Sequence, residues 1–310
     1  MTKSLAYNYN TFTFLMPLVL CLGFFLNLPL GLALTVEKST LNFRTHDGTL
    51  IQATIHRYEK NKNKGRSQTS KLPVLMVFGG FKYADQVLTL PSPKLPIALM
   101  SFPYPFDPPK KPFQFPGSLK LLPDAKKTIW NTLWGIDALI EVLHQEKSDS
   151  YHLDQITLLG ASFGAPFVTY ALTRNPKIKA AIIVQGFGRL KETLQSQISE
   201  KIKPSLGMFS TPISWFLVQL GWAYVGLPHL ETEVRSLRAS KKVLMLQAEE
   251  DSFLSKHSQR SLQRAFEDSE AQFTSEWLPG KHLAPGADQQ IETLTKRVTH
   301  WLQNHQLLRE

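Results

Sequence analysis

Residues 156–174 read ITLLGASFGAPFVTYALTR. The first four residues are a short apolar run, which predicts a buried strand, and the last nine have the composition of a helix. Between them, Gly160-Ala161-Ser162-Phe163-Gly164 has the spacing G-x-S-x-G. Glycines at these positions permit a sharp turn from strand to helix that exposes the serine hydroxyl. The stretch therefore predicts a reactive Ser162 at the carboxyl end of a buried strand.

From residue 72 onward, short apolar runs alternate with amphipathic stretches. The predicted strands are residues 74–78, 97–102, 156–160, 180–185, 243–248 and 273–278, and the predicted helices are residues 124–145, 162–174, 256–267 and 288–307. This alternation is typical of a mostly parallel sheet with helices on both faces. We therefore expect an α/β fold.

Residues 41–58 (LNFRTHDGTLIQATIHRY) carry a different pattern. Two alternating runs flank Asp47-Gly48, which is the strongest short-range signal for a β-hairpin. We expect an antiparallel N-terminal hairpin at the edge of the sheet.

The composition excludes several classes of protein. The chain has 310 residues, 43% of them hydrophobic and 19% charged, which is a globular balance. Its net charge of +10 is scattered, so we expect no nucleic-acid partner. Cys21 is the only cysteine, which excludes a disulfide scaffold and a thiolate-rich metal site. The histidines other than His282 show no metal-ligand spacing, and we expect no metal and no cofactor.

Residues 1–33 differ from the rest of the chain. Lys3 is their only charged residue, and an apolar run extends over residues 12–34. This pattern is typical of an export signal, and Gly31-Leu32-Ala33 offers a small-x-small cleavage site. The run is also long enough for an uncleaved anchor, in which residues 12–34 associate with a membrane. Both alternatives place a domain of residues 34–310 outside the cytoplasm: periplasmic, secreted or anchored at the outer membrane face.

Two regions interrupt the alternation of strands and helices. Residues 103–116 hold six prolines and four aromatic residues, which predict a stiff extended loop. Residues 188–240 have helical periodicity and form a predicted cap or lid insertion. The middle of this insertion, residues 204–230, contains no Asp, Glu, Lys or Arg. We expect it to pack as a lid over the sheet, and a surface that contacts lipid is the alternative.

A serine hydroxyl is a weak nucleophile unless a base takes its proton and a carboxylate orients that base. Asp251 follows the predicted strand 243–248, and His282 lies in a loop before the last helix. Glu250 is the alternative acid. The order Ser162, Asp251, His282 is the order found in α/β-hydrolases.

The chain resembles the α/β-hydrolase superfamily over nearly all of residues 34–310. The motifs RTHDGTLIQATIHR, VFGGF, GASFG, LQAEED and PGKH occur in the order of that family. The opening is similar to dienelactone-hydrolase-like and prolyl-oligopeptidase-like members. The resemblance implies that Ser162 is the nucleophile, His282 the general base and acid, and Asp251 the orienting carboxylate. In the family's G-x-x-D acid motif, Ala248 replaces the glycine, which favours Asp251 over Glu250.

Acyl transfer also requires two N–H donors for the developing oxyanion. One is expected from the backbone of Phe163, directly after the nucleophile. The other is expected from the turn after strand 74–78, from either Gly80 or Phe81. Residues 82–93, beyond that turn, are too short and proline-bounded for a full helix.

These residues predict an exported or membrane-anchored serine hydrolase that cleaves a small-molecule carboxylic ester with an apolar acyl group. A peptidase of the prolyl-oligopeptidase-like type is one alternative, and an inert membrane-associated binding protein is another. An acyltransferase would have the same sequence features.

Overall fold

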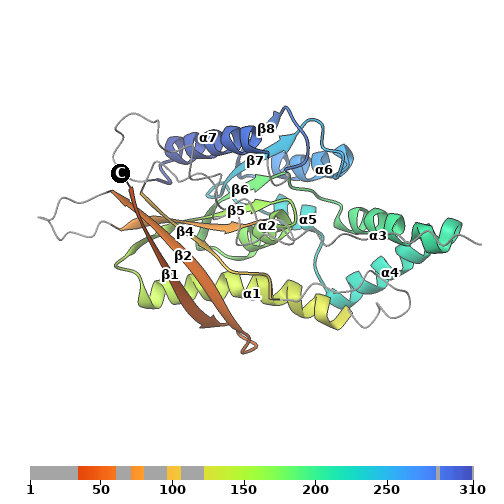
Figure 1. Ribbon diagram of the computed structural model, residues 1–310, viewed down its shortest axis with the longest axis horizontal. Helices are drawn as coiled ribbons and strands as arrows, with labels where there is room; N and C mark the ends of the chain where they lie inside the picture. Colours follow the sequence, from red (N-terminus) through yellow and green to blue (C-terminus); the bar gives the residue numbers. More distant parts are fainter. Residues whose placement is uncertain (1–33, 61–70, 80–95, 106–121, 284–286, 309–310) are drawn as a thin grey trace, which may run out of the picture. The chain divides into compact units, whose positions relative to one another are not determined.

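The computed structural model describes residues 34–60, 71–79, 96–105, 122–283 and 287–308. These residues form an eight-stranded sheet with the order β1-β2-β4-β3-β5-β6-β7-β8 (Figure 1). The strands are β1 (Leu34–Arg44), β2 (Leu50–Lys60), β3 (Leu72–Phe78), β4 (Ile97–Ser101), β5 (Tyr151–Ala161), β6 (Ile178–Val184), β7 (Lys242–Ala248) and β8 (Gln272–Leu278). β1 and β2 are antiparallel to their neighbours, and β4, β3 and β5 to β8 run parallel. The predicted α/β class and the antiparallel hairpin are confirmed.

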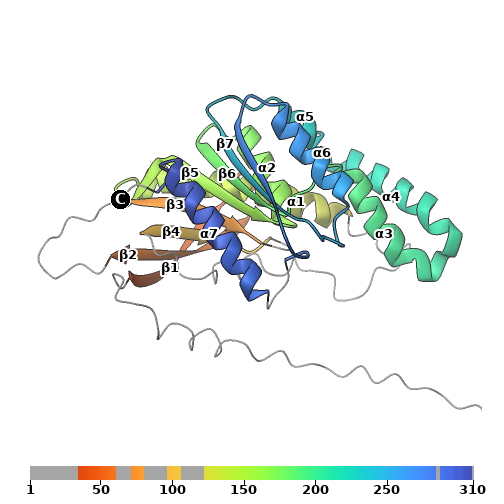
Figure 2. The same cartoon turned by 90° about the horizontal axis from the view of Figure 1, so that it is seen from above.

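Helices cover both faces of this sheet (Figure 2). The helices outside the insertion are α1 (Leu122–Glu146), α2 (Gly164–Arg174), α6 (Lys256–Glu267) and α7 (Asp288–Asn304). Buried side chains of α1, α2 and α6 share one apolar cluster with the sheet. Those of α7 share the cluster on the opposite face.

Coverage of both faces explains why the strand sequences are apolar without alternation. In β3, Met76 and Phe78 belong to one cluster, and Leu75 and Val77 belong to the other. All seven residues of this strand are buried. A strand buried on both faces requires such a continuous apolar run.

The N-terminal hairpin is longer than the sequence predicts. The pairing of β1 with β2 extends from the pair of Leu34 with Lys60 to the pair of Arg44 with Leu50. It therefore exceeds the predicted limits of residues 41 and 58. The turn contains Gly48 with φ 82°, a left-handed conformation suited to glycine. The side chains of residues 36–40 are all exposed, so no apolar alternation marks that part of the strand.

The insertion between β6 and β7 is helical. Its elements are α3 (Leu190–Leu206), the short 3₁₀ helix η4 (Gly207–Phe209), α4 (Ser210–Val225) and α5 (Leu230–Arg235). α3 and α4 pack against each other, and Trp130 Nε1 of α1 donates a hydrogen bond to the Val225 carbonyl of α4 at 2.8 Å. Figures 1 and 2 show both helices beyond the end of the sheet. The expected packing over the sheet is therefore not seen in the described residues, and α4 instead keeps large apolar side chains exposed.

Other predictions lie wholly or partly outside the described residues. They concern the segment 1–33, Gly80, Phe81, residues 82–93, and most of the loop 103–116. Among the helices that the structure does describe, none has both the length and the apolar character needed to cross a membrane.

Candidate active site

Ser162 lies at the turn between β5 and α2 and has a left-handed backbone with φ 51°. Two backbone hydrogen bonds hold this turn. Ser162 N–H donates to the Val184 carbonyl at 2.9 Å, and the Ser162 carbonyl accepts from Ala165 N–H at 3.0 Å. A non-glycine residue in this conformation is strained, and such strain persists only where the surrounding structure imposes it.

The two glycines of the motif are required by close packing. A Cβ atom at Gly164 would lie 2.1 Å from the Phe78 carbonyl oxygen at the end of β3. A Cβ atom at Gly160 would lie 2.7 Å from the Gly164 carbonyl oxygen. The G-x-S-x-G spacing therefore lets β5, α2 and the end of β3 approach one another around Ser162.

His282 brings its imidazole to this hydroxyl. Its Nε2 atom lies 2.9 Å from Ser162 Oγ, and its Nδ1 atom lies 2.7 Å from Asp251 Oδ2. The turn before it contains Gly280 with φ 122°, a conformation that favours glycine. When the Nδ1–H group donates a hydrogen bond to Asp251, the unprotonated Nε2 atom can accept the proton of the serine hydroxyl.

Asp251 lies just past β7 with no exposed side-chain surface. Besides His282, its carboxylate accepts hydrogen bonds from the backbone N–H groups of Phe253 and Leu254, both at 2.9 Å. Burial acts to raise the pKa of Asp251, but the hydrogen bonds from His282 and the two N–H groups outweigh it, and the pKa lies below its ordinary value. Glu250, the alternative acid, is exposed. The structure thus brings Ser162, His282 and Asp251 together and leaves Glu250 outside.

Two buried glutamines, which the sequence analysis did not single out, support these residues. Gln259 Nε2 of α6 donates to Asp251 Oδ2 at 3.0 Å. Gln185, directly after β6, donates from Nε2 to the Lys281 carbonyl at 3.1 Å and accepts at Oε1 from Leu283 N–H at 2.6 Å. Because the chain distance is nearly 100 residues, no local sequence pattern signals this contact.

The region expected to bind the oxyanion is only partly described. Gly80 and Phe81 lie outside the described residues, and Phe163 is the N-cap residue that precedes α2. Tyr104, from the loop after β4, donates its hydroxyl proton to the Gly79 carbonyl at 2.7 Å. Its ring contacts Phe163 at 5.3 Å between centroids. Tyr104 therefore connects the turn after β3 to the turn that carries Ser162, and burial raises its pKa, which keeps it a donor.

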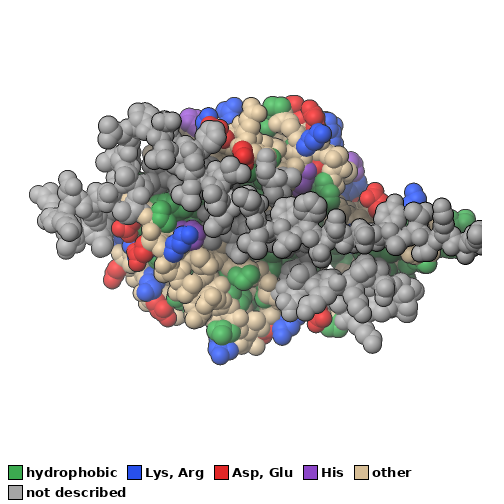
Figure 3. All heavy atoms as spheres, in the orientation of Figure 1, with side chains coloured by type: hydrophobic (Ala, Val, Ile, Leu, Met, Phe, Trp, Pro, Cys, Tyr) green, Lys and Arg blue, Asp and Glu red, His purple; other side chains and the backbone are tan. Residues whose placement is uncertain are grey.

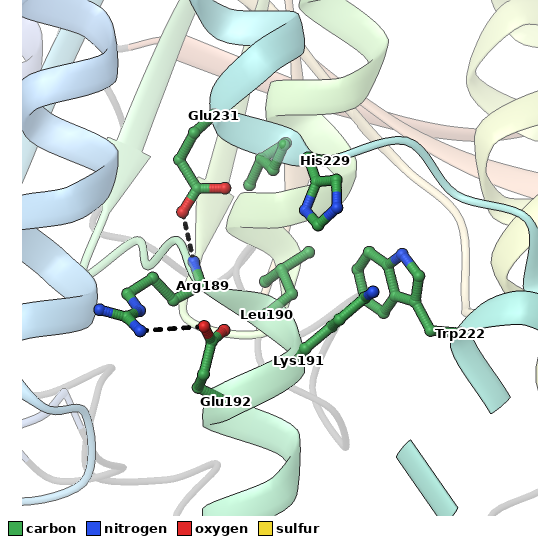
Figure 4. A pocket seen from close by; sticks show the side chains of 8 residues that line it. Arg189, Leu190, Lys191, Glu192, Trp222, His229 and Glu231 are labelled. Atoms are coloured by element: carbon green, nitrogen blue, oxygen red, sulfur yellow. Dashed lines mark hydrogen bonds and ion pairs between the residues drawn. The ribbon is translucent and has the colours of Figure 1, made fainter. Parts of the chain in front are cut away.

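A separate pocket of about 120 Å³ lies at the base of the insertion (Figure 4). Arg189 and Lys191 line it together with Trp222, His229 and Glu231, and the Arg189 N–H donates to Glu231. None of Ser162, Asp251 and His282 lines this pocket. Its polar groups contact one another, so we assign the chemistry to the Ser162 site.

The fold agrees with those of known structures. An esterase of Pyrococcus furiosus has a TM-score of 0.59 and 11% identity over 87% of this chain and 91% of its own. The acylaminoacyl peptidase of Pyrococcus horikoshii has a TM-score of 0.59 and 15% identity over 87% of this chain and 41% of its own. A cold-adapted esterase from an Arctic intertidal metagenomic library has a TM-score of 0.53 and 14% identity over 86% of this chain and 95% of its own.

These likenesses and the strand order define the α/β-hydrolase fold for this chain. The chain spans less than half the length of the peptidase, which has a further region that this chain does not match. No protein-family model matches the sequence, and comparison with curated protein sequences finds no match.

Proposed function

We propose that this protein is a serine hydrolase that cleaves carboxylic esters through an acyl-enzyme. The continuous hydrogen-bond chain from Ser162 Oγ through His282 to Asp251 carries this proposal. Serine, histidine and aspartate in this geometry are the elements of nucleophilic acyl transfer.

In the proposed reaction, Ser162 Oγ attacks the ester carbonyl while His282 Nε2 takes the hydroxyl proton. The tetrahedral intermediate expels the alcohol, which receives that proton from His282. Water, deprotonated by His282, then attacks the acyl-enzyme and releases the acid, and Ser162 recovers its proton. Asp251 keeps His282 in the tautomer with a proton on Nδ1 and stabilises the imidazolium. The N–H of Phe163 and that of Gly80 or Phe81 are the proposed oxyanion donors.

An apolar acyl group fits the aromatic side chains beside the site. The Phe253 ring lies 5.0 Å from the His282 ring and is 57% exposed, so a substrate can contact it. Phe163 packs against Phe167 and Tyr104 on the other side of the serine turn.

We further propose that the domain acts outside the cytoplasm. The support is in residues 1–33, with their single charge at Lys3, the apolar run 12–34 and the small residues Gly31 and Ala33. Cleavage after Ala33 and retention as an anchor remain the two forms of this proposal. N-terminal sequencing of the protein recovered from membrane and soluble fractions distinguishes them.

Amide hydrolysis is the second candidate, because an acylaminoacyl peptidase is among the similar folds. A panel of nitrophenyl esters with increasing acyl chain length, assayed beside matched acyl nitroanilides, separates the two activities. We expect ester turnover that rises with acyl length to a maximum and is abolished in Ser162→Ala. Preferred turnover of the anilides would support the peptidase, and folded but inert protein would support a binding role.

A further inference from the structure

Helix α4 exposes large apolar side chains of the kind that helices of soluble proteins normally bury. Its 16 residues contain no charged side chain. Its buried residues are Ser210, Ser214, Leu217, Val218 and Val225, and further large apolar side chains face outward. The exposed fractions are 85% for Met208, 61% for Phe209, 53% for Trp215, 59% for Phe216, 44% for Leu220 and 44% for Tyr224. We call these six residues of η4 and α4 the apolar face.

Contacts with α3 and α1 hold the apolar face outward. Ser199 Oγ of α3 donates a hydrogen bond to Ser210 Oγ at 3.3 Å, and Leu217 and Val218 of α4 are buried. At the other end of the helix, the Val225 carbonyl accepts from Trp130 Nε1. These contacts fix the side of α4 that carries Ser210, Leu217 and Val218 inward. Turning the apolar face inward would break them.

Basic side chains border the apolar face at both ends. Lys201 and Lys203 are exposed on α3 just before Met208. Lys126 of α1 places Nζ 4.9 Å from the centre of the Tyr224 ring. Residues 188–230 contain four Lys and Arg residues and two Glu residues, so their net charge is +2. Figure 3 shows small areas of green hydrophobic side chains at this end of the molecule.

We propose that the apolar face docks on the surface of an anionic lipid bilayer. Tryptophan, tyrosine and phenylalanine side chains favour the headgroup region, and lysines beside them attract anionic lipids. The charge argues against a second copy of the chain as the occupant. A symmetric interface would set the lysines of two molecules, each with net charge +10, against one another.

The docking surface is at the same edge of the sheet as the candidate active site. α3 begins at Leu190, shortly after β6 ends at Val184, and Ser162 follows the neighbouring strand β5. Parallel strands bring their carboxyl ends to one edge. Docking therefore brings Ser162 to the side of the molecule that adjoins the lipid. The benefit of this placement for substrate access rests on the proposed hydrolase function.

The test uses the full chain and a local probe, because residues 12–34 could bind lipid independently. In a Cys21→Ser background, a polarity-sensitive fluorophore is attached at Met208→Cys, and in a matched control at Ser148→Cys. Ser148 is exposed just after the far end of α1. Vesicles of phosphatidylcholine, alone or with an equal part of phosphatidylserine, carry brominated acyl chains as quenchers.

We expect the vesicles with phosphatidylserine to shift and quench the probe at position 208 and to leave the probe at position 148 unchanged. Phe209→Ser/Trp215→Ser/Phe216→Ser should weaken this response at least about tenfold in lipid concentration, since three exposed aromatic side chains no longer enter the interface. Lys201→Glu/Lys203→Glu should remove most of the preference for phosphatidylserine. Both variants should keep the wild-type turnover of a soluble short-chain ester.

A probe at position 208 that stays in water while the protein sediments with vesicles would overturn the proposal. So would a shift that appears without vesicles as protein concentration rises, together with a dimeric mass. A positive lipid response in a chain without ester turnover would refute the proposed function alone.

Discussion

Gln185 holds the loop that carries His282 through both polar atoms of its side chain. Its amide donates to the carbonyl before His282, at Lys281, and accepts from the N–H after it, at Leu283. Gln185 is 2% exposed and has a left-handed backbone with φ 50°. A strained and buried residue of this kind fixes the position of the imidazole relative to Ser162 without contacting either reacting atom.

Replacing Gln185 should therefore reduce turnover more than it reduces stability. In Gln185→Leu the Leu283 N–H loses its acceptor, which costs about 1–3 kcal/mol of unfolding free energy. Looser placement of His282 should lower kcat about tenfold to a hundredfold. Ester kinetics and urea unfolding measure the two effects.

Asn131→Leu is the matched control for this variant. Asn131 is also fully buried, and its amide donates to Thr49 Oγ1, away from the site. This variant removes one side-chain hydrogen bond far from His282 and should keep its kcat. Equal kcat losses in both variants would refute the positioning role of Gln185.

Tyr104 supports the turn that precedes the proposed oxyanion donor. Tyr104→Phe keeps the ring against Phe163 and removes the hydrogen bond to the Gly79 carbonyl. We expect a loss of about 1 kcal/mol in stability and a fall in kcat of about twofold to tenfold. Steady-state kinetics with one soluble ester are sufficient.

Tyr170→Phe provides the comparison, because Tyr170 is also a buried tyrosine that donates to a backbone carbonyl at 2.7 Å. Its acceptor is Pro228, in the insertion. The stability loss should match that of Tyr104→Phe while kcat stays at the wild-type value. A reversed ranking in kcat would contradict the assignment.

Gly164 tests whether close packing dictates the serine turn. In Gly164→Ala the new methyl group meets the Phe78 carbonyl oxygen, so the end of β3 must move. We expect a loss of more than about 3 kcal/mol or an insoluble protein. In Gly226→Ala no atom lies within 4 Å of the new Cβ, and only the φ of 71° opposes the change.

Gly226→Ala should therefore cost about 1 kcal/mol. Denaturant unfolding of the two variants measures the difference. If both alanine variants were equally stable, close packing at Gly164 would not be what dictates the turn around Ser162.

The low pKa of Asp251 predicts the acid limb of the stability curve. A carboxyl whose pKa is lowered on folding stabilises the protein above its unfolded pKa of about 4, and this contribution is lost as the pH falls through the folded pKa. The stability advantage of the wild-type protein over Asp251→Asn should be constant near neutral pH and shrink below pH of about 4.

Urea unfolding as a function of pH measures this difference. Asp251→Asn should also lower kcat by about 10³–10⁴-fold at neutral pH, because His282 loses the acceptor that fixes its tautomer. A stability difference independent of pH would mean that Asp251 gains nothing from its charge in the folded protein.

The sequence predicts well what local patterns encode. Continuous apolar runs indicated the parallel strands, and G-x-S-x-G located the strand–helix turn at Ser162. The chain order then predicted that Asp251 and His282 would share an edge of the sheet with Ser162, and the structure places them in contact. The contacts of Gln185 and Gln259 had no such signal, because they join segments that only the completed sheet brings together.

Segment 204–230 was predicted less well for a different reason. An uncharged run indicates that apolar side chains are to be removed from water, but it does not specify which surface they pack against. Packing over the sheet was expected, whereas the structure leaves Phe209, Trp215 and Phe216 exposed. Likewise, the exposed residues of β1 gave no alternation, so the start of the hairpin was not predicted.

Labelling with a fluorophosphonate tests the central claim most directly, because the reagent reacts with an activated serine and requires no knowledge of the substrate. Intact-mass and peptide analysis should find one adduct per chain, on Ser162, and none in Ser162→Ala or after heat denaturation. Folded protein that takes up no label, or a label that persists in Ser162→Ala, would contradict the assignment of Ser162, His282 and Asp251.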